Sequence, residues 1–269
     1  MPKLRTMLTE ERDVPMLLFI WRWKITTTSA LHAKFFPKCT LASAYRRLWD
    51  IEAAGYLSSV LCPGMPGRLW ELSRRGFLAI KERLPLLREV GFKSECLYHD
   101  LLCGALQLGD WIRGTPEAMA LFSEQQLRRY DVQTFPTWVP KAQGHRPDGY
   151  TFLTGEQGSR VIALEVELSA KTPAAYGSLA GFYLHNRPAI TQVLWLVSRA
   201  SFAPHLKGHL ARYDAEAAAT QHDFVALPDF LKLGWQAPVI LGPSNGELLA
   251  DLMAPQKGPR KAPEICGAT

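Results

Sequence analysis

One pair of β-rich runs constrains the fold of this 269-residue chain more than any other feature: GYTFLTG and, after a glycine-containing turn, SRVIALEVELSAK. In the second run, large apolar side chains alternate with alanine and glutamate side chains. Ile162 and Leu164 point to one side of the predicted strand, whereas Glu165 and Glu167 point to the other. The pattern predicts a β-hairpin within a sheet and places two carboxylates on one strand face.

Helical and strand-like segments surround this hairpin. Helical patterns at 174–184 and 202–219 are each followed by a strand-like run, ITQVLWLVS and DFVAL. Upstream, SECLYHDLLCGALQLGDWI and the run 122–130, with Ser123 as its N-cap, are typical of helices. Such alternation favours an α/β domain with a mixed sheet and helices on its faces, which we place at 94–253.

The first third of the chain has a different pattern. Apolar residues recur at helical spacing in 9–21, 27–35 and 40–55, with Thr40 as the N-cap of the third segment. YLSSVL and RLWEL then indicate a β-hairpin, followed by a fourth helix that begins in SRRGFLAI. Three helices and a hairpin predict a winged helix-turn-helix domain at 1–93. The chain as a whole is thus expected to be α/β, or α+β overall.

The third helix of this domain is the candidate for the DNA major groove. Its expected inward face consists of Leu41, Tyr45, Leu48 and Ile51. The candidate DNA contacts come from its outer face, the hairpin and the start of the fourth helix: Ser43, Arg46, Arg47, Arg68, Arg74 and Arg75. The alternative is a winged helix used for dimerisation or protein contacts.

Charge is distributed unevenly between the two predicted domains. The chain has a net charge of +6; residues 1–93 hold 16 Lys or Arg against 8 Asp or Glu, whereas the remainder holds 15 against 17. A net +8 beside a net −2 favours a polyanion as partner of the first domain, although an ordinary solvated surface is the alternative. The absence of a glycine-rich phosphate loop, cofactor motif or nucleophile elbow argues against a small-molecule enzyme.

Three acidic residues are candidate metal ligands. If Asp148 begins the strand beside Glu165 and Glu167, the three carboxylates can converge on Mg²⁺ or Mn²⁺, which favour oxygen ligands. Lys171, just downstream, is the candidate for orienting a nucleophilic water. The alternative is a solvated edge strand, because buried carboxylates on one face repel each other unless a cation or basic group lies between them.

The order Pro147-Asp148 followed by Glu165-Val166-Glu167 resembles the core of the PD-(D/E)xK nucleases, which have a restriction-endonuclease-like fold. The resemblance implies metal-dependent DNA cleavage, with Asp148, Glu165, Glu167 and Lys171 as the catalytic set. Glu167 stands where the superfamily has a lysine. This departure favours a second interpretation, a non-catalytic regulator that needs no cofactor and has a vestigial nuclease-like domain.

Some nucleases of this superfamily also carry a histidine or glutamate on the helix before the sheet. The resemblance therefore implies His99 or Glu95 as a further metal ligand. These two residues lie one helical turn apart. The other interpretation of His99 is a hydrogen-bonded pair with Asp100 inside an apolar helix interface.

Several short motifs in a particular order resemble the replication-relaxation family of bacterial plasmids and mobile elements: LTEERD, RRLWDIEAAGYL, WELSRRG, HRPDG and ALEVELSAK. The resemblance covers most of the chain and implies a role in plasmid replication, DNA relaxation or mobilisation. The charge distribution and the predicted winged helix favour double-stranded DNA as a partner, and the resemblance adds plasmid replication or mobilisation proteins. A homodimer is a further expectation.

The remaining features concern location and thiol chemistry. No apolar run approaches bilayer length, and the start MPKLRTMLTEERD is too polar for a signal peptide, so a cytoplasmic protein without membrane association is expected. The five cysteines form no C-x-x-C pair and have no histidine neighbour at the spacing sought for zinc, which predicts free thiols. The segment 254–269, rich in Pro, Gly and Lys, is expected to be a flexible tail.

Overall fold

The computed structural model describes residues 7–63, 67–141, 144–156 and 158–255, so the predicted tail lies outside it from residue 256 onward. The structure is mixed α/β. Its α-helices are α1 (Asp13–Trp23), α2 (Thr28–Phe35), α3 (Leu41–Ala53), α4 (Arg74–Ile80), α5 (Leu97–Leu108), α6 (Glu124–Arg129), α7 (Pro173–His185), α8 (Phe202–Ala211), α9 (Ala215–Thr220), α10 (Leu227–Leu233) and α11 (Leu249–Leu252).

The strands form two separate sheets. They are β1 (Ile25–Thr27), β2 (Leu57–Val60), β3 (Leu69–Leu72), β4 (Met119–Ser123), β5 (Gly149–Gly155), β6 (Gly158–Glu167), β7 (Gln192–Val197) and β8 (His222–Ala226). Short 3-10 helices lie at Lys81–Arg83, Gly109–Arg113, Val132–Thr134 and Gly234–Gln236. Among these described elements, no helix is long and apolar enough to cross a membrane.

The N-terminal region combines α1 to α4 with the antiparallel sheet β1-β3-β2. The hairpin β2–β3 lies where the sequence predicts it, and β1 adds a third strand that the sequence pattern does not indicate. Trp70 on the central strand is fully buried, and its indole nitrogen donates to the Thr28 hydroxyl at 2.8 Å. The sheet thereby fixes the start of α2.

Helix α3 differs from its predicted packing at two positions. Thr40 caps it as expected, since its hydroxyl accepts from the Ser43 amide at 3.2 Å. Leu41, however, is 46% exposed, because the first turn extends beyond the core, and Ala44 is buried instead. Arg47 was expected on the outer face. It turns inward and forms an ion pair with Asp13, a fully buried carboxylate.

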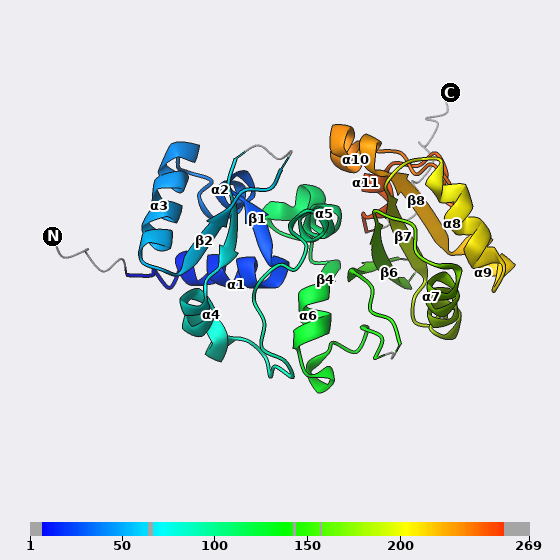
Figure 1. Cartoon of the computed structure of the whole chain (residues 1–269), viewed down its shortest axis with the longest axis horizontal. Coiled ribbons are helices and arrows are strands. Elements are labelled where there is room, and N and C mark those ends of the chain that lie inside the picture. The colour runs from blue at the N-terminus through cyan, green and yellow to red at the C-terminus, as the bar shows by residue number, and fades with distance from the viewer. Residues whose placement is uncertain (1–6, 64–66, 142–143, 157, 256–269) are drawn as a thin grey trace, which may run out of the picture.

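The larger sheet has the order β4-β5-β6-β7-β8. β4, β5 and β6 pair antiparallel, whereas β6, β7 and β8 are parallel, which confirms the expected mixed sheet. Helices α7 and α8 lie on one side of this sheet, and α5 lies on the other (Figure 1). Because β6 is the central strand, the alternative of a solvated edge strand for its carboxylates is wrong.

Side chains and backbone groups of α1 join the N-terminal region to β4. The Arg22 guanidinium donates to the Leu121 carbonyl, and the Ser123 hydroxyl donates to the Arg22 carbonyl at 2.9 Å. Ser123 also caps α6 with a capping box, as predicted. The helix expected from residue 122 begins only at Glu124, because Met119–Ser123 forms an unpredicted edge strand of the larger sheet.

Candidate functional site

The three predicted acidic ligands lie at one end of the β5–β6 hairpin. Asp148 directly precedes β5, and its Oδ2 accepts a hydrogen bond from the Val166 amide at 2.8 Å. Glu165 and Glu167 lie on β6, and each is 3% exposed. Burial of two carboxylates requires compensating partners. The structure provides them from the chain itself.

Glu165 has two partners on the same oxygen. The ring nitrogen Nε2 of His145 lies 2.5 Å from Oε1, and the Tyr183 hydroxyl donates to that atom as well. Tyr183 lies on α7. Burial and the negative charge of Glu165 raise the pKa of Tyr183, so its phenol stays protonated and donates the hydrogen bond to Glu165. Glu165 is therefore held in place by a histidine from the loop before β5 and a tyrosine from α7.

Glu167 forms an ion pair with Lys171, four residues later. Burial, followed by repulsion from the other carboxylates, raises the pKa of Glu167, although Lys171 opposes that rise. Burial alone would lower the pKa of Lys171, yet the hydrogen bond to Glu167 and the nearby carboxylates raise it. Burial is the largest cause for Glu167, whereas the carboxylates together outweigh burial for Lys171. The neighbouring carboxylates contribute to both rises, and this concentration of negative charge favours uptake of a proton or a cation.

The predicted three-carboxylate set is not the one that converges. Within the described ranges, one group of three potential ligands has donor atoms that all lie within 4.8 Å of one another, namely His99, Cys103 and Asp148. His99, which the nuclease resemblance implies as a further metal ligand, lies close to Asp148, at 3.4 Å between Nε2 and Oδ2. Glu95, the alternative ligand, instead pairs with Arg128 at 2.6 Å.

Cys103 lies one turn after His99 on α5, and its sulfur is 3.5 Å from Nδ1 of the ring. The expectation that no cysteine has a histidine at a metal-ligand spacing is therefore wrong. Burial would lower the pKa of His99, but hydrogen bonds to Asp100 and Asp148 raise it. Burial and the charge of Asp148 raise the pKa of Cys103, so without a metal its thiol stays protonated.

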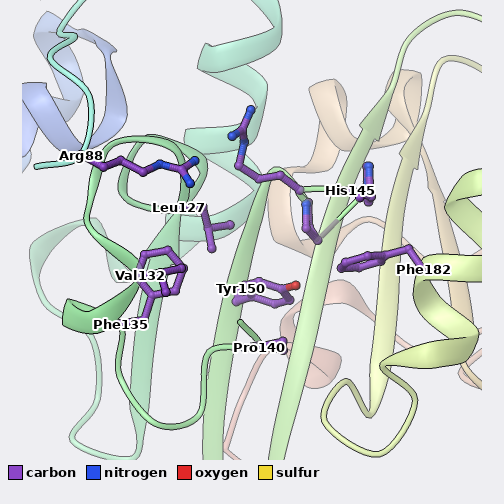
Figure 2. A pocket seen from close by; sticks show the side chains of 11 residues that line it. Arg88, Leu127, Val132, Phe135, Pro140, His145, Tyr150 and Phe182 are labelled. Carbon is purple, nitrogen blue, oxygen red and sulfur yellow. The ribbon is translucent and has the colours of Figure 1, made fainter. Parts of the chain in front are cut away.

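A cavity of about 390 Å³ opens beside His145 and Tyr150 (Figure 2). It is lined by Arg88, Leu127, Val132, Phe135, Pro140, Gly144, His145, Arg146, Pro147, Tyr150 and Phe182. His145 links the cavity to the buried Glu165, and the guanidinium of Arg88 also faces it (Figure 2). A cavity of this size suits a small ligand or part of a larger one.

The candidate DNA contacts fall into two groups. Arg46, Arg68 and Arg74 are exposed, as is Ser43, whose hydroxyl hydrogen-bonds with that of Thr40 at 2.9 Å.

Arg68, although exposed, donates to the Ser59 hydroxyl at 2.7 Å, and two further arginines have structural partners. Arg47 is held by Asp13. Arg75 is exposed, but its Nη1 donates to the Ala54 carbonyl at the end of α3 at 2.6 Å, and its guanidinium lies 4.4 Å from the Tyr56 ring centre. The expectation of a solvent-facing Arg47 is therefore wrong.

Comparison with protein-family models, curated proteins and solved structures finds no match to this chain. The site therefore has to be interpreted from its own geometry. Sequence reasoning missed His145, Tyr183 and Cys103. His145 stands in HRPDG, three residues before Asp148, and the i, i+4 spacing of His99 and Cys103 was a signal for a shared helix face.

Proposed function

We propose that this protein binds duplex DNA through its N-terminal region, with α3 as the recognition helix of a winged helix. The observation that carries the proposal is the exposed surface shared by α3 and the β2–β3 hairpin. Arg46 and Trp49 of α3 face solvent, and Arg68 at the hairpin lies 5.8 Å above the Trp49 ring centre. The arginine side chains could contact DNA phosphates, and the neighbouring tryptophan ring could contact apolar parts of the bases.

The order of elements supports the same proposal. Helix, strand, two helices and a hairpin, with the sheet order β1-β3-β2, are the arrangement expected of a winged helix. The excess positive charge of residues 1–93 supplies long-range attraction to phosphates. The hairpin is then placed to contact the DNA backbone beside the groove that α3 enters.

Duplex binding at several salt concentrations tests this proposal. Arg46→Ala should weaken binding several-fold and reduce the slope of log K against log salt by about 1, since one phosphate contact is lost. Arg212→Ala is the charge-matched control, because Arg212 is exposed at the end of α8, far from α3 (Figure 1). An unchanged slope in Arg46→Ala, or an equal loss in Arg212→Ala, would contradict the proposal.

A second candidate function is metal-dependent cleavage of DNA by the larger domain, as the nuclease resemblance implies. The observation that favours it is the contact between His145 and Glu165 at the edge of the cavity. A buried carboxylate that orients a partly exposed imidazole is a common arrangement for moving a proton. Mg²⁺ or Mn²⁺ would reach the excess negative charge around Asp148 and Glu167.

Incubation with supercoiled DNA tests the second candidate, with Mg²⁺, Mn²⁺ or EDTA. We expect metal-dependent nicking that is lost in Glu165→Gln and retained in Glu216→Gln, since the side chain of Glu216 is 74% exposed on α9. Binding without nicking in every condition would instead favour the non-catalytic regulator. The role in plasmid replication, relaxation or mobilisation rests on the family resemblance and is part of the same proposal.

A further inference from the structure

The strongest unassigned feature is the convergence of three different ligand types at the start of β5. His99 and Cys103 come from adjacent turns of α5, and Asp148 comes from the loop that enters the sheet. The three donors are a nitrogen, a sulfur and an oxygen. Mg²⁺ and Ca²⁺ bind oxygen almost exclusively, so a thiol in the set points to a softer ion.

We propose that His99, Cys103 and Asp148 bind a transition-metal ion of the zinc class, with a fourth position left for solvent. Ligand atoms at zinc bond lengths in a tetrahedral site lie about 3.3 to 3.7 Å from one another. Here Nε2 of His99 is 3.4 Å from Oδ2 of Asp148 and 4.0 Å from Sγ of Cys103. The His99–Asp148 distance already matches a tetrahedral site, whereas Cys103 must move closer, since the three donor atoms lie within 4.8 Å of one another.

The surroundings of His99 match those of a metal-binding imidazole. When Nε2 binds a metal, the opposite nitrogen needs an acceptor that fixes the ring. Oδ1 of Asp100 lies 3.7 Å from Nδ1, just beyond hydrogen-bond distance, and this carboxylate is held by Lys24 at 2.6 Å and by Ser94 at 2.7 Å. A fixed acidic group is thus near the ring nitrogen that would face away from the metal, and a small rotation of the ring would bring the two into contact.

The available space fits an ion and not a substrate. A cavity of about 10 Å³, about the least that holds one water molecule, is lined by Cys103 and Asp148 and also by Arg22 and Lys24, while His99 lies outside its lining. A thiol nucleophile activated by His99 would need room for its substrate beside the sulfur. The small volume therefore favours a bound ion over nucleophilic catalysis by Cys103.

This site is distinct from the three-carboxylate set of the nuclease resemblance. Glu165 is held by His145 and Tyr183, and Glu167 is held by Lys171. Asp148 is common to both sets, and His99 is the further ligand that the resemblance implies, so the new element is Cys103 and with it a softer ion. The zinc-class site needs no DNA, so its test is independent of the proposed DNA binding and cleavage.

Titration of the EDTA-treated full chain with Co²⁺ tests the inference. We expect one ion per chain, a near-ultraviolet thiolate-to-cobalt absorption band, and displacement of Co²⁺ by an equimolar amount of Zn²⁺ but not by Mg²⁺ in large excess. Cys103→Ser should abolish the band. Cys96→Ser should retain it, because Cys96 is exposed at the start of the same helix. His99→Gln should weaken Zn²⁺ binding at least about tenfold.

Alkylation of the wild-type chain provides a measurement that needs no variant. Zn²⁺ should slow the modification of Cys103 while leaving that of the exposed Cys39 and Cys96 unchanged. The inference is overturned if the wild type gives no thiolate band, if Cys103→Ser keeps it, if Mg²⁺ displaces Co²⁺, or if Zn²⁺ leaves Cys103 unprotected.

Discussion

The two regions of this molecule use charge in opposite ways. In the N-terminal region, cations such as Arg46, Arg68 and Arg74 lie at the surface. In the region of the larger sheet, carboxylates such as Glu165 and Glu167 are buried and matched by protein side chains. An exposed charge loses little solvation free energy and stays accessible to a partner molecule, whereas a buried charge requires a compensating group.

This difference separates a cationic surface, where we propose that DNA binds, from an interior that holds ionisable groups in fixed positions. Perturbed ionisable groups near a cavity are typical of functional sites. The exposed cations of the first region are typical of electrostatic recognition. Lys24 is the exception that connects the two regions. It follows α1, yet its ammonium lies 2.6 Å from Asp100 and 2.8 Å from Glu124.

Removal of the Lys24 charge should have the largest effect on stability. Lys24→Met removes the cation that Asp100 and Glu124 share and leaves Glu124 with Arg146 at 3.3 Å, so we expect the free energy of unfolding to fall by about 3 kcal/mol in urea titrations. Lys232→Met, on the exposed face of α10, should change it by no more than about 0.5 kcal/mol. Similar small changes in both variants would mean that the link between the regions contributes little.

Acid should selectively destabilise the region of the larger sheet through His222. This residue is 2% exposed, and the Trp195 indole donates to its Nδ1 at 3.0 Å. Burial is the main cause that lowers the pKa of His222 to about 4. The charge of Asp214 raises this pKa and the charge of Lys207 lowers it. The unfolded chain takes up a proton near pH 6.5, so stability falls from there towards pH 4, by up to about 3 kcal/mol.

Unfolding titrations across this pH range measure the effect of His222. Glutamine does not titrate, so in His222→Gln the free energy of unfolding should fall less steeply with falling pH than in the wild type. The variant is expected to be less stable than the wild type at pH 7. This offset does not affect the test, which compares how steeply the unfolding free energy of each protein changes with pH. Parallel curves for the two proteins would show that His222 does not stay neutral in the folded state.

Arg47 should affect stability, whereas its neighbour Arg46 should affect DNA binding. Arg47→Ala removes a partner of the buried Asp13, and Arg12 remains at 3.1 Å, so we expect a loss of about 2 kcal/mol. Arg46→Ala should leave the unfolding free energy within about 0.5 kcal/mol of the wild type. Equal destabilisation by the two changes would contradict the assignment of Arg47 to an internal ion pair.

Local patterns predicted much of the fold because they act over a few residues. The caps at Thr40 and Ser123 and the hairpin of β5 and β6 are confirmed. Strands β1 and β4 were not predicted. β1 has 3 residues, too few to show an alternating pattern, and the sequence of β4, MALFS, merges with the apolar pattern of the next helix. The helix expected at 202–219 is interrupted, because Asp214 caps a second helix by accepting from the Ala217 amide at 2.8 Å.

The sequence by itself determined the helix caps, the strand alternation that puts Glu165 and Glu167 on one face, and the concentration of cations in the first third of the chain. The tertiary structure decided which charges meet. Arg47 finds Asp13 across 34 positions of sequence, and Lys24 finds Asp100 across 76.

The same holds for the ligands at the start of β5. Helical spacing brings His99 to Cys103, but only the packing of α5 against the sheet brings both to Asp148. Periodicity follows from backbone geometry and is visible in any short window of sequence. Contacts between distant residues depend on how whole elements pack, and a short window of sequence carries no record of that packing.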